Sequence, residues 1–88
     1  MKSRRSKRFR ASLEVLPPDI QRLATDTYRR WQQNPSHPGL HFKPIDSSDP
    51  DIYSIRIGAH YRAICERQPD GAYLLVWIGT HEEYDKLI

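Results

Sequence analysis

The sequence has one cysteine and no long run of apolar residues, and each shortage excludes a class of protein. Cys65 has no partner for a disulfide within the chain, and a single cysteine argues against a cysteine-based zinc site. The longest apolar run, residues 74–78, is far too short to span a membrane. No apolar signal segment follows the basic N-terminus. We therefore expect a cytoplasmic protein without a metal ion, another cofactor or a membrane contact.

Acidic residues are missing from the first ten positions, which hold six of the Lys and Arg residues. The rest of the chain carries the other eight Lys and Arg against all eleven Asp and Glu, so its net charge is −3, whereas the whole chain has +3. Residues 1–7 are therefore expected to form a mobile basic arm on a mildly acidic body. The arm is either a solvated tail or a contact for phosphate or an acidic partner. Its candidate phosphate-binding residues are Arg4, Arg5, Lys7 and Arg8.

Residues 1–88 fit one small domain whose first half is mainly helical. The apolar spacing over residues 9–16 matches a helical face, although alternation over the same segment also allows a strand. Ser6 is a plausible N-cap, which favours a short helix ended by Pro17. A clearer helix begins at Pro18 and ends at Asn34.

The second half of the chain shows the pattern of a β-meander. A short strand is expected around residues 41–45, and longer ones over residues 52–58, 60–67 and 72–79. Turn residues separate the longer strands, and the last strand is apolar enough to be central in the sheet. The predicted class is α+β, with an N-terminal helical hairpin packed on a small twisted antiparallel sheet.

Alternation along the first long strand divides its side chains between two faces. Ser54 and Arg56 fall on the face opposite Tyr53, Ile55 and Ile57. We expect the apolar face to pack on the helices and the other face to carry Arg56.

The strand ends gather groups that suit an RNA phosphodiester. Arg62 begins one strand and His81 follows the next, so the meander should make them neighbours, with Arg56 across the hairpin, unless the register shifts. Arginines bind phosphate oxygens, and histidine exchanges a proton near neutrality. Nearby arginines would lower the pKa of Tyr84, which could also stack on a base. RNA supplies its own 2′-hydroxyl nucleophile, so this chemistry needs no metal.

Each of these residues also has an ordinary structural interpretation. Arg56 and Arg62 could pair with acids such as Glu66, and His81 could be a simple polar residue after a strand. Tyr84 could pack against the core. Other residues fit such roles as well: Glu82, Glu83 and Asp85 as a solvated face, and Trp31 and Trp77 as core.

Four motifs, in their order and spacing, resemble the RelE/ParE superfamily of toxins from bacterial type II toxin–antitoxin modules. They are LPPDIQRLA, NPSHPGLHFK, YSIRIGAHYRAI and WIGTHEEYDKL. The resemblance covers about residues 9–88 and implies the same helical hairpin on a twisted sheet, with an antitoxin as partner. For the RelE branch it implies cleavage of mRNA in the ribosomal A site. There the 2′-hydroxyl attacks the adjacent phosphate, giving a cyclic phosphate and a 5′-hydroxyl.

The resemblance also implies roles for single residues. Arg56 would act on the substrate phosphate, and Arg62 would stabilise the transition state. His81 falls where relatives place a group for proton transfer or charge stabilisation. Tyr84 lies near an aromatic, base-stacking position, and Lys43 lies near a basic position that helps to bind RNA.

Two departures from the family pattern keep other functions open. The family's opening strand would have to come from the few charged residues before Phe9, so it is short, absent or replaced by a partner's strand. Ser54 stands where some ribosome-dependent members carry a lysine. The alternatives to an mRNA endoribonuclease are a ParE-type, non-catalytic inhibitor of DNA gyrase and a non-toxic RelE-like interaction module. His81 and Tyr84 count against the gyrase inhibitor.

Overall fold

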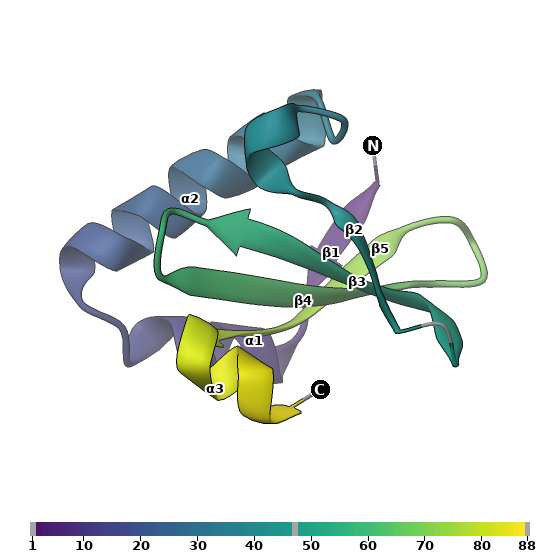
Figure 1. The fold of residues 1–88 in the computed structure, drawn as a ribbon. Coiled ribbons are helices and arrows are strands. Elements are labelled where there is room, and N and C mark those ends of the chain that lie inside the picture. Colours follow the sequence, from purple (N-terminus) through teal and green to yellow (C-terminus); the bar gives the residue numbers. More distant parts are fainter. Residues whose placement is uncertain (1, 47, 88) are drawn as a thin grey trace.

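The computed structural model describes residues 2–46 and 48–87, and within them a five-stranded mixed sheet separates two helical layers (Figure 1). The sheet has the order β1-β5-β4-β3-β2. Its strands are β1 (Ser3–Arg5), β2 (Lys43–Asp46), β3 (Asp49–Ile57), β4 (Tyr61–Arg67) and β5 (Tyr73–Thr80). The helices are α1 (Lys7–Glu14), α2 (Pro18–Gln33), the short 3-10 helix η1 (Pro38–Leu40) and α3 (His81–Leu87). In this part of the chain, no helix has the length and apolarity needed to cross a membrane.

The two N-terminal helices form as the sequence predicts. The Ser6 side chain accepts a hydrogen bond from the Phe9 N–H at 3.0 Å, so residues 7–14 are helix and not strand. Pro18 opens α2, where its missing N–H costs nothing, and Asn34 is the C-cap. The predicted α+β class is confirmed.

One apolar core lies between the sheet and the helices α1 and α2. Trp31 of α2 is fully buried, and its ring meets Phe42 and Tyr73 edge-on, at centroid distances of 5.5 and 5.7 Å. Ile55 and Ile57 join the same cluster from β3. The predicted alternation of β3 therefore places its apolar residues under the helices and leaves Arg56 for the other face.

In the described part of the basic arm, residues 3–5 form a strand and Lys7 begins α1, so the prediction of a mobile arm is wrong there. Residues Ser3–Arg5 pair parallel with β5, so the sheet is mixed and the opening strand is present but short. Asp70 anchors this strand through ion pairs with Lys2 and Arg4. The Arg4 hydrogen bond, with a second from the Ala72 N–H, holds the pKa of Asp70 far below its usual value. The high positive charge of this segment argued against a strand. Pairing with β5 and the ion pairs to Asp70 stabilise the strand despite that charge.

The C-terminal residues form α3, a helix that the sequence analysis did not predict. Thr80 and Glu83 make a capping box at its start. The Glu83 N–H donates to the Thr80 hydroxyl at 3.1 Å, and the Glu83 carboxylate accepts from the Thr80 N–H at 2.9 Å. The hydrogen bonds that the Glu83 carboxylate accepts from the Thr80 N–H and the Thr80 hydroxyl lower the pKa of Glu83. Glu83 therefore fastens the helix to β5, and it lies exposed at the surface, as expected for a solvated face.

Gly79 allows α3 to close against its face of the sheet. A Cβ atom at this position would lie 2.4 Å from the Trp77 ring and 3.0 Å from the Glu83 carboxylate. Trp77 is only half-buried and is absent from the core cluster, so the prediction that it belongs to the core is wrong. The close approach of these groups leaves no room for a side chain at residue 79.

We predict that Gly79→Ala lowers the free energy of unfolding by about 1–3 kcal/mol, because the added methyl group overpacks the contact with Trp77. Urea denaturation measures the change. In a Trp77→Leu background the additional cost of the alanine should be clearly smaller, since the ring that it strikes is gone. An equal cost in both backgrounds would contradict this account of the glycine.

Candidate functional site

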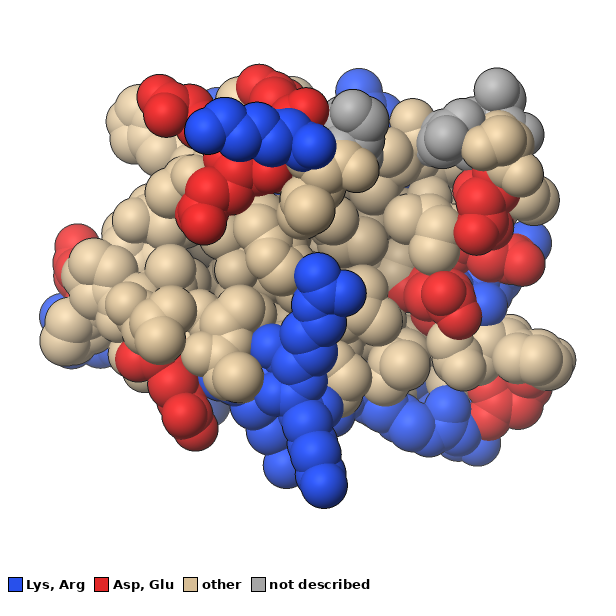
Figure 2. All heavy atoms as spheres, turned by 90° about the horizontal axis from the view of Figure 1, so that it is seen from below, with Lys and Arg blue, Asp and Glu red and all other residues tan. Residues whose placement is uncertain are grey.

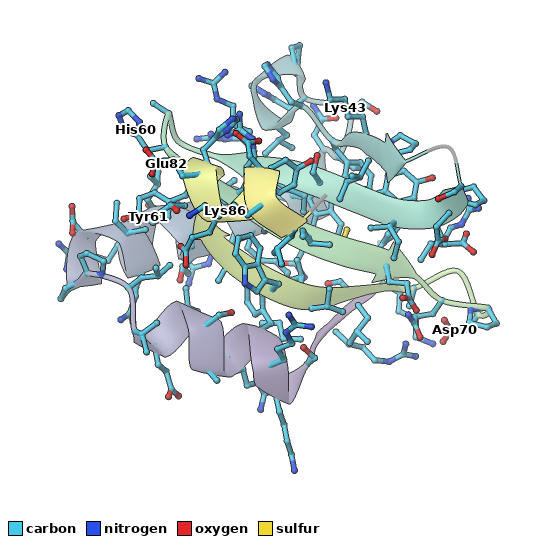
Figure 3. All side chains as sticks on the ribbon, turned by 60° about the horizontal axis from the view of Figure 1, so that its bottom comes forward. Lys43, His60, Tyr61, Asp70, Glu82 and Lys86 are labelled. Atoms are coloured by element: carbon cyan, nitrogen blue, oxygen red, sulfur yellow. The ribbon has the colours of Figure 1, made fainter. Side chains whose placement is uncertain are left out.

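The face of the sheet opposite the core carries three basic side chains in two neighbouring rows. Cross-strand partners share a face, so Arg56, Arg62 and Gly79 form one row. Lys43 pairs with Ser54 in the next row. The sequence predicted the Arg56–Arg62 arrangement, and the structure adds Lys43 on the same face. Figure 3 shows Lys43 on the side of the sheet that α3 occupies.

Ser54 lies beneath this face and not at its surface. Its side chain is 4% exposed, so it offers no contact to a phosphate group. The basic face therefore depends on Lys43, Arg56 and Arg62.

Arg56 and Arg62 are direct cross-strand partners, an arrangement in which like charges destabilise a sheet. Each guanidinium donates to a backbone carbonyl: Arg56 Nε to Gly58 O and Arg62 Nη1 to Tyr61 O, both at 3.0 Å. Among the described residues neither forms an ion pair, and the Glu66 carboxylate accepts from Gln68 instead. The expected alternative, in which these arginines pair with acids, is therefore not what the structure has. Their remaining N–H groups can bind an anion.

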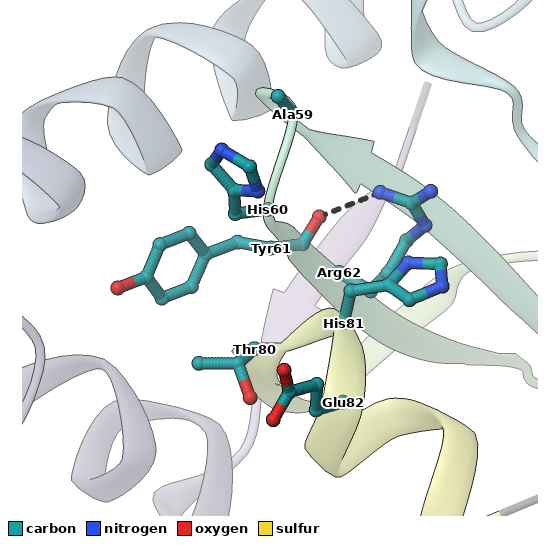
Figure 4. A pocket seen from close by; sticks show the side chains of 7 residues that line it. All are labelled: Ala59, His60, Tyr61, Arg62, Thr80, His81 and Glu82. Carbon is teal, nitrogen blue, oxygen red and sulfur yellow. Dashed lines mark hydrogen bonds between the residues drawn. The ribbon is translucent and has the colours of Figure 1, made fainter.

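His81 stands at the junction of β5 and α3. Its backbone N–H donates to the His60 carbonyl at 2.8 Å, which ties it to the start of β4. Its Nε2 lies 3.2 Å from the Asp85 carboxylate, one helical turn further on. Figure 4 shows the His81 ring beside the Arg62 side chain. The neighbours predicted from the meander are thus brought together.

Tyr84 packs under α3 beside His81. It is 9% exposed, and its ring centroid lies 6.1 Å from that of His81. Because the ring is buried, it has no open face on which a base could stack. The structure gives Tyr84 the packing role that was the alternative interpretation, directly behind the histidine.

A cleft of about 500 Å³ opens at this end of the sheet (Figure 4). It is lined by residues 59–62, from the β3–β4 turn and the start of β4, and by residues 80–82, from the end of β5 and the start of α3. Arg62 and His81 line it, whereas Arg56 and Tyr84 do not. The cleft also contains three side chains to which the sequence analysis gave no site role: His60, Tyr61 and Glu82.

The cations of the basic arm lie away from the cleft. Arg4 pairs with Asp70, and the Arg5 guanidinium lies 5.9 Å from the centre of the Tyr28 ring. Lys7 and Arg8 are exposed at the start of α1. Figure 2 shows a group of basic side chains on the α1 side, whereas α3 carries acidic side chains together with Lys86. The arm and the cleft are therefore separate surfaces.

Acidic and histidine side chains do not converge on a possible metal position. In residues 2–46 and 48–87 no group of three or more His, Cys, Asp or Glu side chains is arranged to hold a metal ion.

Comparison with known proteins identifies the family. The family model of the ParE-like toxin domain matches residues 18–86. No curated protein sequence matches the chain.

Several solved structures have the same fold. The RelB–RelE antitoxin–toxin complex from Methanococcus jannaschii is similar with a TM-score of 0.73 and 20% identity, over 96% of both chains. The RelBE2 toxin–antitoxin complex from Mycobacterium tuberculosis has a TM-score of 0.72 and 18% identity, over 91% of this chain and 90% of that one. A YoeB/ParE toxin from Agrobacterium tumefaciens has a TM-score of 0.71 and 15% identity, over 92% of this chain and 99% of that one. These likenesses show the fold.

We predict that Arg62→Met raises the free energy of unfolding at low salt by about 0.2–1 kcal/mol, because it removes the repulsion from Arg56 while keeping an apolar stem. Added salt should reduce the gain by screening. The matched control is Arg67→Met on the same strand, which breaks an ion pair with Asp51 and should give no gain. A loss of stability in Arg62→Met equal to that in the control would contradict the claim of an uncompensated charge pair.

Proposed function

The chain belongs to the family of ParE-like toxin domains, within the RelE/ParE superfamily of toxins of toxin–antitoxin systems, and from that premise we propose that it cleaves mRNA on the ribosome. The observation that carries the proposal is the pair of Arg56 and Arg62, which have no acidic partner among the described residues, beside His81. Two guanidinium groups on one face, next to a group that can transfer a proton, suit a phosphodiester.

The geometry suggests a division of the chemistry. Arg56 and Arg62 would hold the non-bridging oxygens of the scissile phosphate, and their charge would stabilise the transition state. The 2′-oxygen forms a bond to phosphorus while the bond from phosphorus to the 5′-oxygen breaks. The 2′-hydroxyl proton passes to water, and protonated His81 gives its proton to the departing 5′-oxygen. Asp85 holds the ring at Nε2, which leaves Nδ1 for the substrate.

Other basic residues would extend the RNA contact. Lys43, on the face of the two arginines, would bind a neighbouring phosphate. Arg5, Lys7 and Arg8 would contact ribosomal RNA from the separate arm surface, where binding should weaken with salt. Arg4 would contribute less, because Asp70 already pairs with it.

We further propose a cognate antitoxin as partner and the cytoplasm as location. Two of the similar structures are toxin–antitoxin complexes, which supports the partner. The location follows from the proposed target, since the ribosome is in the cytoplasm.

A second candidate function is non-catalytic inhibition of DNA gyrase. The ParE-like family model and the YoeB/ParE relative favour it. Gyrase inhibition without catalysis does not require a histidine beside two arginines that lack an acidic partner among the described residues, so we rank this function second. A non-toxic interaction module is less well supported than the sequence suggested, because the opening strand β1 is present.

We predict that Arg62→Ala and His81→Ala each reduce mRNA cleavage by about 100-fold or more, since each removes a group that acts on the transition state. The proteins would be induced in bacterial cells beside the wild type, with growth followed and mRNA 5′ ends mapped. Arg67→Ala is the matched control, because this arginine shares β4 with Arg62 but pairs with Asp51. The control should cut as the wild type does.

Other outcomes would redirect the proposal. Growth arrest without new 5′ ends within translated codons would favour gyrase. Normal cleavage by both folded variants would show that Arg62 and His81 do not form the catalytic site.

A further inference from the structure

The three acidic residues at the start of α3 have different surroundings. Glu83 is occupied with the cap at Thr80, and Asp85 pairs with His81. Glu82 alone makes no hydrogen bond or ion pair with the described part of the chain, and it lines the cleft. Glu82 is exposed, as expected of a solvated face, and its carboxylate is free to accept hydrogen bonds from a molecule in the cleft.

The cleft has two chemically different sides. Figure 4 shows His60 and Tyr61 on one side, and Arg62 with His81 on the other. The alternation of β4 places Tyr61 opposite Arg62, while His60 precedes the strand, in the β3–β4 turn. Figure 3 places His60, Tyr61 and Glu82 together at the end of the sheet where α3 begins. One side thus offers cations and the other offers two flat rings with a carboxylate.

We propose that His60, Tyr61 and Glu82 form a nucleobase subsite that favours guanine next to the scissile phosphate. This inference rests on the proposed function, because the phosphate held by Arg62 and His81 would bring the base into the cleft. The exposed His60 provides a ring on which a base can stack, and Tyr61, which packs partly against the core, adds the part of its ring that lines the cleft. A carboxylate on this side would repel a phosphate, so the group that it accepts should be an uncharged donor.

Guanine is the base whose pairing edge matches a carboxylate. A carboxylate has two acceptor oxygens and no donor. The edge of guanine presents N1–H and the 2-amino group side by side, so both oxygens of Glu82 receive a hydrogen bond. Adenine and cytosine present an amino group beside an acceptor nitrogen, and uracil presents one N–H between two carbonyls. Each of these three bases would set an acceptor against the carboxylate.

The test is binding of RNA fragments that cannot be cleaved. Four 2′-O-methyl trinucleotides that differ only in the middle base would be titrated into the full chain and followed by ¹H–¹⁵N NMR. For the wild type we expect the guanine fragment to bind about fivefold or more tighter than the other three, the lower end of what a two-bond base contact gives. Glu82→Gln should reduce this preference to less than about twofold, because the amide replaces one acceptor by a donor.

The matched control is Glu66→Gln. It makes the same change at an exposed glutamate of β4 that does not line the cleft. It should keep the guanine preference. Unchanged amide spectra before titration would show that both variants are folded, as expected for exposed side chains.

The outcomes separate this inference from the proposed function. Equal binding of all four fragments by the wild type, or a guanine preference that survives Glu82→Gln, would overturn the base subsite and leave RNA cleavage standing. Absence of binding for every fragment would also overturn the base subsite, whereas cleavage on the ribosome is decided separately by the mapped mRNA 5′ ends. Guanine preference in the wild type and in Glu66→Gln, lost only in Glu82→Gln, would support the subsite.

Discussion

The hydrogen-bonded register of β3, β4 and β5 is the constraint on which both the core and the candidate site depend. It places Ile55 and Ile57 against the N-terminal helices and sets Arg56 opposite Arg62 on the other face. A slip of one residue would exchange the faces, putting an arginine in the core and the isoleucines in water. Burial of the apolar face therefore fixes the arginine pair in place. The strand pairing that buries the isoleucines also holds the two arginines side by side, although their charges repel each other.

The distribution of charge follows from this two-sided design. The basic arm lies on β1 and α1, at the sheet edge opposite β2, whereas the acids of α3 surround the end of the cleft. Two of these acids have local tasks, since Glu83 caps the helix and Asp85 holds His81. Long-range attraction of RNA would thus come from the arginine face and the arm. The acidic side chains of α3 would act only through direct contacts with a bound RNA.

Much of this arrangement was predictable from residue patterns. Alternation in β3 and the order of the meander gave the neighbours Arg56, Arg62 and His81, because strand faces and hairpin connections follow local rules. β1 was not predictable in this way, since its charged residues form a strand only through pairing with β5 and an ion pair to Asp70. The helix α3 could have been found from its Thr80–Glu83 capping box. The cleft could not, because it joins segments about twenty residues apart.

The most direct test of the central claim uses purified protein and ribosomes that carry one defined mRNA. The same mRNA would be prepared with a single 2′-deoxy nucleotide at the cut position. The account predicts cleavage of the unmodified mRNA, with a cyclic phosphate at the new 3′ end, and no cleavage at the modified position. Cleavage of the deoxy mRNA at that position would contradict attack by the 2′-hydroxyl. Absence of any cut in the unmodified mRNA, with a folded protein, would contradict the assignment of an endoribonuclease.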